Sequence, residues 1–165
     1  MRRFYRQLGL AAIAAAFATS PVAAQVLTTQ FNVNITITAA CLLKSATTLN
    51  FGTAGVIAAN IDSTSAIVVQ CTNNTPYNLG LNEGTGTGAT IANRLMTGPA
   101  AATVGYSLYT TTGRTTVWGN TIASNTQTGT GTGSDQTFTV FGRVPPQASP
   151  AVGNYTDTIT ATLTY

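Results

Sequence analysis

Hydrophobic and polar residues alternate along much of the chain with the period of two that is typical of β-strands. In residues 31–38 the odd positions are Phe, Val, Ile and Ile, while the even positions are Asn or Thr. Alternation of this kind places apolar side chains on one face of a strand and polar side chains on the other. We therefore predict a strand at residues 31–38.

Further strands are predicted where β-branched and aromatic residues cluster between turn signals. These stretches are residues 48–51, 66–71, 77–82, 104–109, 137–144 and 154–165. Segments rich in Gly, Asn and Thr, such as 82–88 and 125–135, separate them and are predicted to be loops, and no segment after residue 24 has a sustained helical period. The pattern predicts one all-β domain, an immunoglobulin-like antiparallel sandwich.

The closing stretch, residues 154–165, alternates almost without interruption. Its two faces are five threonines at even positions and, at odd positions, Tyr155, Asp157, Ile159, Ala161, Leu163 and Tyr165. Asp157 is the exception on the apolar face, and we expect it at the rim because a buried, unpaired carboxylate is costly. A strand this apolar is an aggregation hazard unless a neighbouring strand covers its edge.

Residues 1–24 have the three parts of a secretory signal peptide: basic residues (Arg2, Arg3, Arg6), an apolar run at 8–18, and small residues before Gln25. The run is shorter than the roughly 20 residues of a spanning helix, so we expect export and no membrane span after cleavage. Removing three of the seven basic residues leaves four against four acidic ones. A neutral mature chain has no basic surface for nucleic acid.

Cys41 and Cys71 both lie in the predicted mature chain. An even number of cysteines in an exported protein predicts one disulfide. The sequence contains no histidine, so we expect no metal or cofactor site.

Candidate catalytic groups are few, and we expect no enzyme. Glu83 and Asp157 sit in turn or strand settings where surface roles are favoured over a glycosidase pair. Trp118, Tyr106 and Tyr109 are either core aromatics, as is usual at strand spacing, or a platform for stacking on a sugar. The second alternative would make the protein a carbohydrate-binding adhesin module.

A family likeness rests on short motifs in a fixed order. These are "FNVNITITAAC", "LNFG", "VVQCTNNTPYNLGLNEG", "RLM", "YSLY", "WG", "FTVFGRVPPQ" and "VGNYTDTITATLTY". Together with the two cysteines and the signal peptide, they resemble the spore coat protein U domain family, which includes subunits of archaic chaperone-usher pili. The likeness spans nearly all of residues 25–165.

The resemblance implies an incomplete sandwich that lacks its final strand. A periplasmic chaperone would hold the subunit, an outer-membrane usher would assemble it, and the N-terminal segment of an identical or related subunit would complete it. The product would be a secreted surface fibre supporting adhesion or biofilm formation, or, alternatively, a non-fibrous spore or cell coat.

The resemblance also implies roles for particular residues. The donor segment would be about residues 25–34, with Val26, Phe31 and Val33 as plugs, and strand A would follow through Cys41; alternatively, residues 31–37 pack as a first strand within their own subunit. The terminal strand would contact the chaperone or the donor through Ile159, Ala161, Leu163 and Tyr165, with the Tyr165 carboxylate as an anchor for basic chaperone residues.

Overall fold

The computed structural model describes residues 21–165, so the predicted signal peptide lies almost entirely outside the described residues. The chain divides after Ile35. Residues 21–35 are exposed and form neither helix nor strand, whereas residues 36–165 make up the second unit. Within residues 21–165 there is no helix with the length and apolar character needed to cross a membrane.

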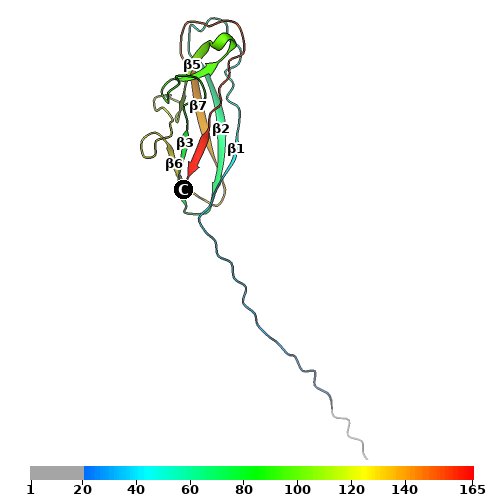
Figure 1. The fold of residues 1–165 in the computed structure, drawn as a ribbon. Helices are drawn as coiled ribbons and strands as arrows, with labels where there is room; N and C mark the ends of the chain where they lie inside the picture. The colour runs from blue at the N-terminus through cyan, green and yellow to red at the C-terminus, as the bar shows by residue number, and fades with distance from the viewer. Residues whose placement is uncertain (1–20) are drawn as a thin grey trace, which may run out of the picture. The chain divides into compact units, whose positions relative to one another are not determined.

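Residues 36–165 fold into two antiparallel sheets (Figure 1). The strands of the described chain are β1 (Cys41–Ala46), β2 (Ile61–Cys71), β3 (Pro76–Leu81), β4 (Arg94–Thr97), β5 (Thr103–Tyr109), β6 (Gln127–Thr130), β7 (Asp135–Val144) and β8 (Ala161–Thr164), with one 3-10 turn, η1 (Pro99–Ala101). The larger sheet has the order β1-β2-β7-β5-β4, and the smaller has β6-β3-β8. The predicted all-β antiparallel sandwich is confirmed.

The core lies between the sheets and is built from alternate residues of the central strands. On β3, Tyr77, Leu79 and Leu81 point inward, because the strand period of two turns every second side chain to the same face. Val69 and Val140 are buried from the facing sheet. This is the period-two pattern that the sequence displays.

Trp118 lies at the centre of this core and is 0% exposed. Its indole N–H donates to the carbonyl oxygen of Leu79 at 2.9 Å, and its ring meets Phe138 edge-on at 6.3 Å. Tyr106 is also buried. The sugar-stacking platform is therefore wrong for these two aromatics, since neither presents a face to solvent.

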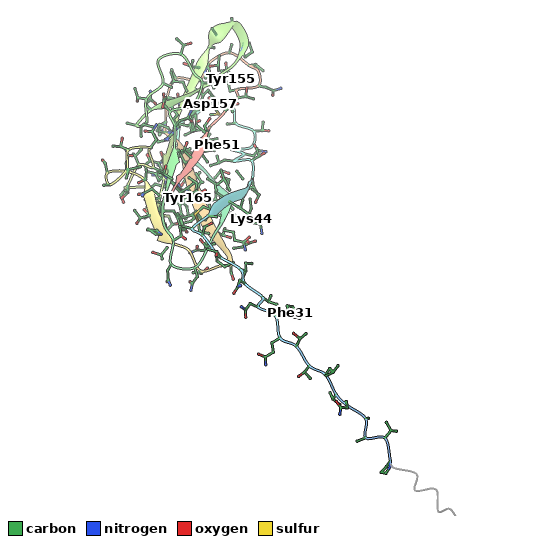
Figure 2. All side chains as sticks on the ribbon, turned by 60° about the horizontal axis from the view of Figure 1, so that its bottom comes forward. Phe31, Lys44, Phe51, Tyr155, Asp157 and Tyr165 are labelled. Atoms are coloured by element: carbon green, nitrogen blue, oxygen red, sulfur yellow. A yellow bond between two sulfur atoms is a disulfide. The ribbon has the colours of Figure 1, made fainter. Side chains whose placement is uncertain are left out.

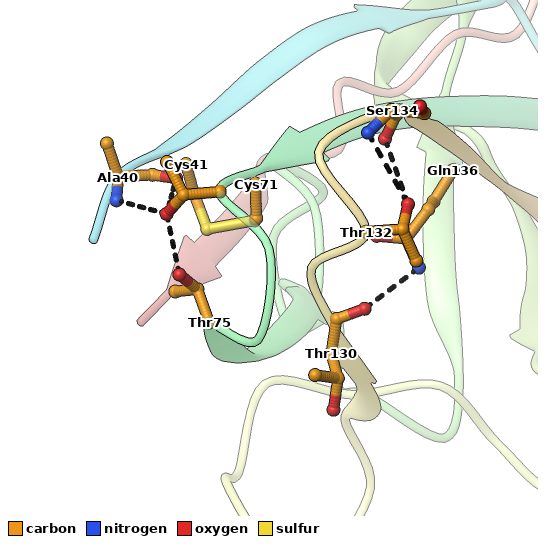
Figure 3. Close-up of a disulfide and its surroundings, with 9 residues drawn as sticks. Ala40, Cys41, Cys71, Thr75, Thr130, Thr132, Ser134 and Gln136 are labelled. Carbon is orange, nitrogen blue, oxygen red and sulfur yellow. Dashed lines mark hydrogen bonds between the residues drawn. A yellow bond between two sulfur atoms is a disulfide. The ribbon is translucent and has the colours of Figure 1, made fainter. Parts of the chain in front are cut away.

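The predicted Cys41–Cys71 disulfide is confirmed and joins the first residue of β1 to the last residue of β2 (Figure 3). Beside it, the Thr72 N–H donates to the Ala40 carbonyl at 2.9 Å, and the Ala40 N–H donates to the Thr72 hydroxyl at 3.0 Å. In the loop-entropy model, a ring closed across 30 residues contributes roughly 3 to 4 kcal/mol. The bond fixes the start of an edge strand that is exposed along most of its length.

Three predicted strands differ from the structure. Residues 31–38 and 48–51 form no strand. The closing stretch is a strand only at Ala161–Thr164, with an isolated bridge between Thr156 and Thr97. In addition, the first strand, β1, begins at Cys41, whereas strand A was expected to run through that residue. The sequence of these stretches suits a strand, but a strand also needs a hydrogen-bonded neighbour. Residues 31–37 are exposed and belong to no strand of the described chain.

Strand β6 falls in the stretch of glycine and threonine that was predicted to be a loop. Residue 129 pairs with Tyr77 of β3, and a side chain at this position would overlap the Tyr77 ring. Glycine is required here because the tyrosine ring crosses the backbone of the neighbouring strand. A composition that usually marks a loop therefore serves close packing.

The buried position of Trp118 gives a direct test of the core. We expect Trp118→Ala to lower the free energy of unfolding by about 3 to 5 kcal/mol, because it removes a large buried side chain and leaves a cavity. Val152→Ala is the control, since Val152 is fully exposed, and should change stability by less than about 0.5 kcal/mol. Urea denaturation measures both; equal, small effects would contradict this description of the core.

Candidate functional site

An apolar groove of about 1040 Å³ opens into the core along one side of the sandwich. One wall is the chain that follows β1, residues 46–55, and the other is the chain that leads into β8, residues 149–161. Figure 2 labels Tyr155 and Asp157, which belong to the second wall, and Phe51, which belongs to the first. The floor contains core side chains of both sheets: Ile67, Leu81, Val104, Tyr106, Leu108, Val140 and Val144.

Half-buried hydrophobic side chains form the walls of the groove. Leu49 and Phe51 on one wall, and Tyr155, Ile159 and Ala161 on the other, pack against the core without being covered. Phe51 meets the ring of Tyr106 edge-on at 6.1 Å. The exposed apolar surface of the groove is thus on its walls, whereas the core side chains of its floor are already buried.

Hydrogen bonds hold the second wall along one edge only, to Thr97 of β4 in the larger sheet and to Asn82, which follows β3 in the smaller sheet. Thr156 and Thr97 exchange two backbone hydrogen bonds, of 2.9 and 3.1 Å. The Thr160 N–H donates to the side-chain oxygen of Asn82 at 2.8 Å, and the Asn82 N–H donates to the Thr160 carbonyl at 3.1 Å. The even positions therefore face the neighbouring chain.

The odd positions between them have free backbone groups. Within the described residues, no hydrogen bond uses the backbone N–H or C=O of Asp157 or Ile159. Successive residues of an antiparallel strand direct these groups to opposite edges. The second wall therefore has an unpaired outer edge, and β8 is likewise the last strand of its sheet.

The first wall has an unpaired stretch as well. The Thr47 N–H still donates to the Ala66 carbonyl on β2, at 2.9 Å. Beyond it, the backbones of Thr48, Leu49 and Phe51 make no hydrogen bond within residues 21–165. Two stretches that the sequence predicts as strands thus border the same groove: residues 48–51 form no strand pairing, and residues 154–160 are paired along one edge only.

Asp157 interrupts the apolar wall, but its carboxylate is fully hydrogen-bonded. One oxygen accepts from the Thr85 N–H and hydroxyl, both at 2.8 Å, and from the Thr158 N–H at 2.7 Å. The other accepts from the Tyr106 hydroxyl at 2.7 Å. Burial raises the pKa of Tyr106 far above its ordinary value, and the hydrogen bond to Asp157 raises it further, so the tyrosine remains a donor.

Arg94 lies beneath this region and is 0% exposed. Its guanidinium donates to the carbonyl oxygens of Leu81, Asn82, Ile91 and Trp118, at 2.7 to 3.2 Å. Burial lowers the pKa of Arg94, and the nearby Tyr106 and Asp157 oppose that shift. The sequence pattern gives no sign of this structural role of Arg94, because an arginine beside apolar residues does not reveal that its side chain will donate hydrogen bonds to four carbonyls.

Comparison with known proteins agrees with this architecture. The model of the Spore Coat Protein U domain matches residues 27–162. The chain belongs to this family. Protein U of Myxococcus xanthus is 31% identical over 168 residues, with 93% of each chain covered. The predicted family is therefore confirmed.

The fold of residues 36–165 is similar to that of a chain in a pilus pre-assembly complex. The match is to the crystal structure of the CsuC-CsuE chaperone-tip adhesion subunit pre-assembly complex from archaic chaperone-usher Csu pili of Acinetobacter baumannii. The TM-score is 0.53 at 23% identity, over 79% of this chain and 40% of that chain. At this identity the likeness concerns the fold.

The predicted site residues of this chain fall into two groups. Val26, Phe31 and Val33 lie in the N-terminal segment with 83 to 85% of their surface exposed. Of the terminal residues, Ile159 and Ala161 line the groove, whereas Leu163 packs against the core and Tyr165 is exposed. No group of three or more His, Cys, Asp or Glu side chains gathers in the part of the domain that the structure describes.

The unpaired edge predicts an alternating pattern of amide exchange. We expect the amide hydrogens of Asp157 and Ile159 to exchange at least about tenfold faster than those of Thr156 and Thr160, because only the latter pair is hydrogen-bonded. Hydrogen-exchange NMR of the mature chain, without a partner, measures the exchange rates of all four amides. Equal protection would show that this edge is already covered.

Proposed function

We propose that the protein is a structural subunit of a secreted surface fibre of the chaperone-usher type, assembled by strand addition into the groove. The observation that carries the proposal is the groove itself, which has an apolar floor and an unpaired edge on each wall. An incoming strand would hydrogen-bond to these edges and bury its apolar face in one step. This accounts for the strand-like sequences at residues 48–51, which form no strand pairing, and at residues 154–160, which are paired along one edge only.

The N-terminal segment has the properties that the groove requires of a donor. Phe31 and Val33 alternate with polar residues and are 84% and 83% exposed. Burying each such side chain contributes roughly 1.5 to 3 kcal/mol. The donor is residues 25–34, and the equally exposed Ile35 and Ile37 continue its apolar face.

A donor segment and a groove formed by different parts of one subunit make a head-to-tail contact between copies. Contacts of this kind propagate into a filament when the rotation between subunits does not close a ring. The signal peptide at residues 1–24 would direct export to the periplasm, where a chaperone strand would occupy the groove until an outer-membrane usher exchanges it for the next subunit. The pre-assembly complex with a similar fold supports a chaperone as the first partner. Adhesion or biofilm formation would be the role of the completed fibre.

A non-fibrous coat protein is the second candidate, because the matched family is named for a spore coat and the Myxococcus relative spans 93% of the chain. Electron microscopy of producing cells separates the two candidates. Ordered filaments support the fibre, and an amorphous layer supports the coat.

A pair of matched double variants tests the donor. We expect Phe31→Asp with Val33→Asp to reduce fibre yield at least about tenfold, because two carboxylates would enter an apolar groove. Asn32→Asp with Asn34→Asp adds the same charge on the opposite face of the segment and should assemble normally. The assay is fibre yield by sedimentation and electron microscopy after co-expression with chaperone and usher.

Two results would count against strand donation by this segment. One is equal assembly of both double variants. The other is normal fibre formation by a chain from which residues 25–34 have been deleted.

A further inference from the structure

We infer that Asp157 is a positioning residue, which holds the free edge of the groove in an extended conformation before a donor strand arrives. This inference rests on the proposed function, because it assigns a task to a side chain within the same groove. Asp157 is also the residue for which the apolar pattern of the closing stretch gives no explanation. Its surroundings supply one.

The carboxylate ties together three parts of the chain. Tyr106 belongs to β5, Thr85 belongs to the loop between β3 and β4, and Thr158 is the next residue of the wall itself. A carboxylate only accepts hydrogen bonds, and four N–H or O–H groups donate to this one. The site is thus built for an acceptor side chain at position 157.

The loop that supplies Thr85 is shaped and anchored for this contact. Gly84 has a φ of +88°, and a side chain there would overlap the Asp157 carboxylate. The side-chain oxygen of Asn82 accepts from both the Gly84 N–H and the Thr160 N–H, at 3.2 and 2.8 Å. Arg94 fixes the carbonyls of Asn82 and Ile91 at the two ends of the loop. The loop that donates to Asp157 is therefore itself held by hydrogen bonds with Asn82 and Arg94.

These hydrogen bonds matter because the backbone of the wall is held at few points. Among the described residues, the backbone of 154–160 pairs only through Thr156 with Thr97 and through Thr160 with Asn82, and its outer edge is unpaired. Segments with few buried contacts and free backbone groups open at low free energy. A strand that arrives at a disordered edge must pay for ordering it, whereas a preformed edge lowers that penalty. Asp157 would therefore accelerate donor capture.

The test measures capture of a synthetic peptide that spans residues 25–38. The acceptor is the mature chain carrying Phe31→Asp and Val33→Asp, so that its own segment does not compete. We expect Asp157→Ala to slow peptide association at least about tenfold at temperatures far below Tm. Asp157→Asn should stay within about threefold of the parent, because its oxygen still accepts three hydrogen bonds and the Tyr106 hydroxyl can accept from its amide.

The matched control is Asp135→Ala, which removes a surface ion pair with Lys44 outside the groove and should leave the association rate unchanged. Thr85→Val serves as a milder variant if Asp157→Ala does not fold, and should slow association about threefold. A parent-like rate for Asp157→Ala, or for Thr85→Val in its place, overturns the inference. A parent chain that does not bind the peptide at all overturns the proposed function instead.

Discussion

An unpaired strand edge beside an open hydrophobic core is the constraint on which this structure depends. Backbone N–H and C=O groups that leave water need partners, and half-buried hydrophobic side chains lower the free energy further when they are covered. At residues 154–160 the outer backbone edge is unpaired, and Tyr155 and Ile159 are only half-buried. One added strand would meet both needs, which is the basis of the proposed assembly.

The rest of the fold keeps the two walls in place while the groove is empty. Residues 42–46 of β1, the edge strand that leads into the first wall, are exposed, and the Cys41–Cys71 bond anchors the start of that strand to β2, which pairs with β7 over ten positions. On the other wall, Arg94 and Asp157 provide the anchors through partly buried hydrogen bonds. Because polar groups in a low-dielectric interior are costly unless satisfied, these contacts favour one arrangement of the loop and the wall. The covalent bond and the polar contacts thus act on opposite sides of the same groove.

Much of the fold could be predicted because its interior follows the period of two. The alternation at 77–82 and 104–109 corresponds to β3 and β5, and the even cysteine count corresponds to the disulfide. The local pattern could not predict which strands pair. Residues 48–51 have a strand-like sequence but no neighbouring strand, and Gly129 lies in β6 although the stretch around it has the composition of a loop. The roles of Arg94 and Asp157 were also out of reach, since each depends on carbonyls or donors contributed by distant parts of the chain. The errors at 48–51 and 154–160 are themselves informative, because they mark the edges that border the groove.

Amide exchange with and without the synthetic peptide of residues 25–38 tests strand addition most directly. Added to the donor-deficient chain, the peptide should protect the amides of Asp157 and Ile159, which are unbonded in the free domain, while the already bonded amides of Thr156 and Thr160 change little. That result would place a new strand along the outer edge of the wall. Saturating peptide that leaves Asp157 and Ile159 as exchangeable as before would contradict strand addition at this groove.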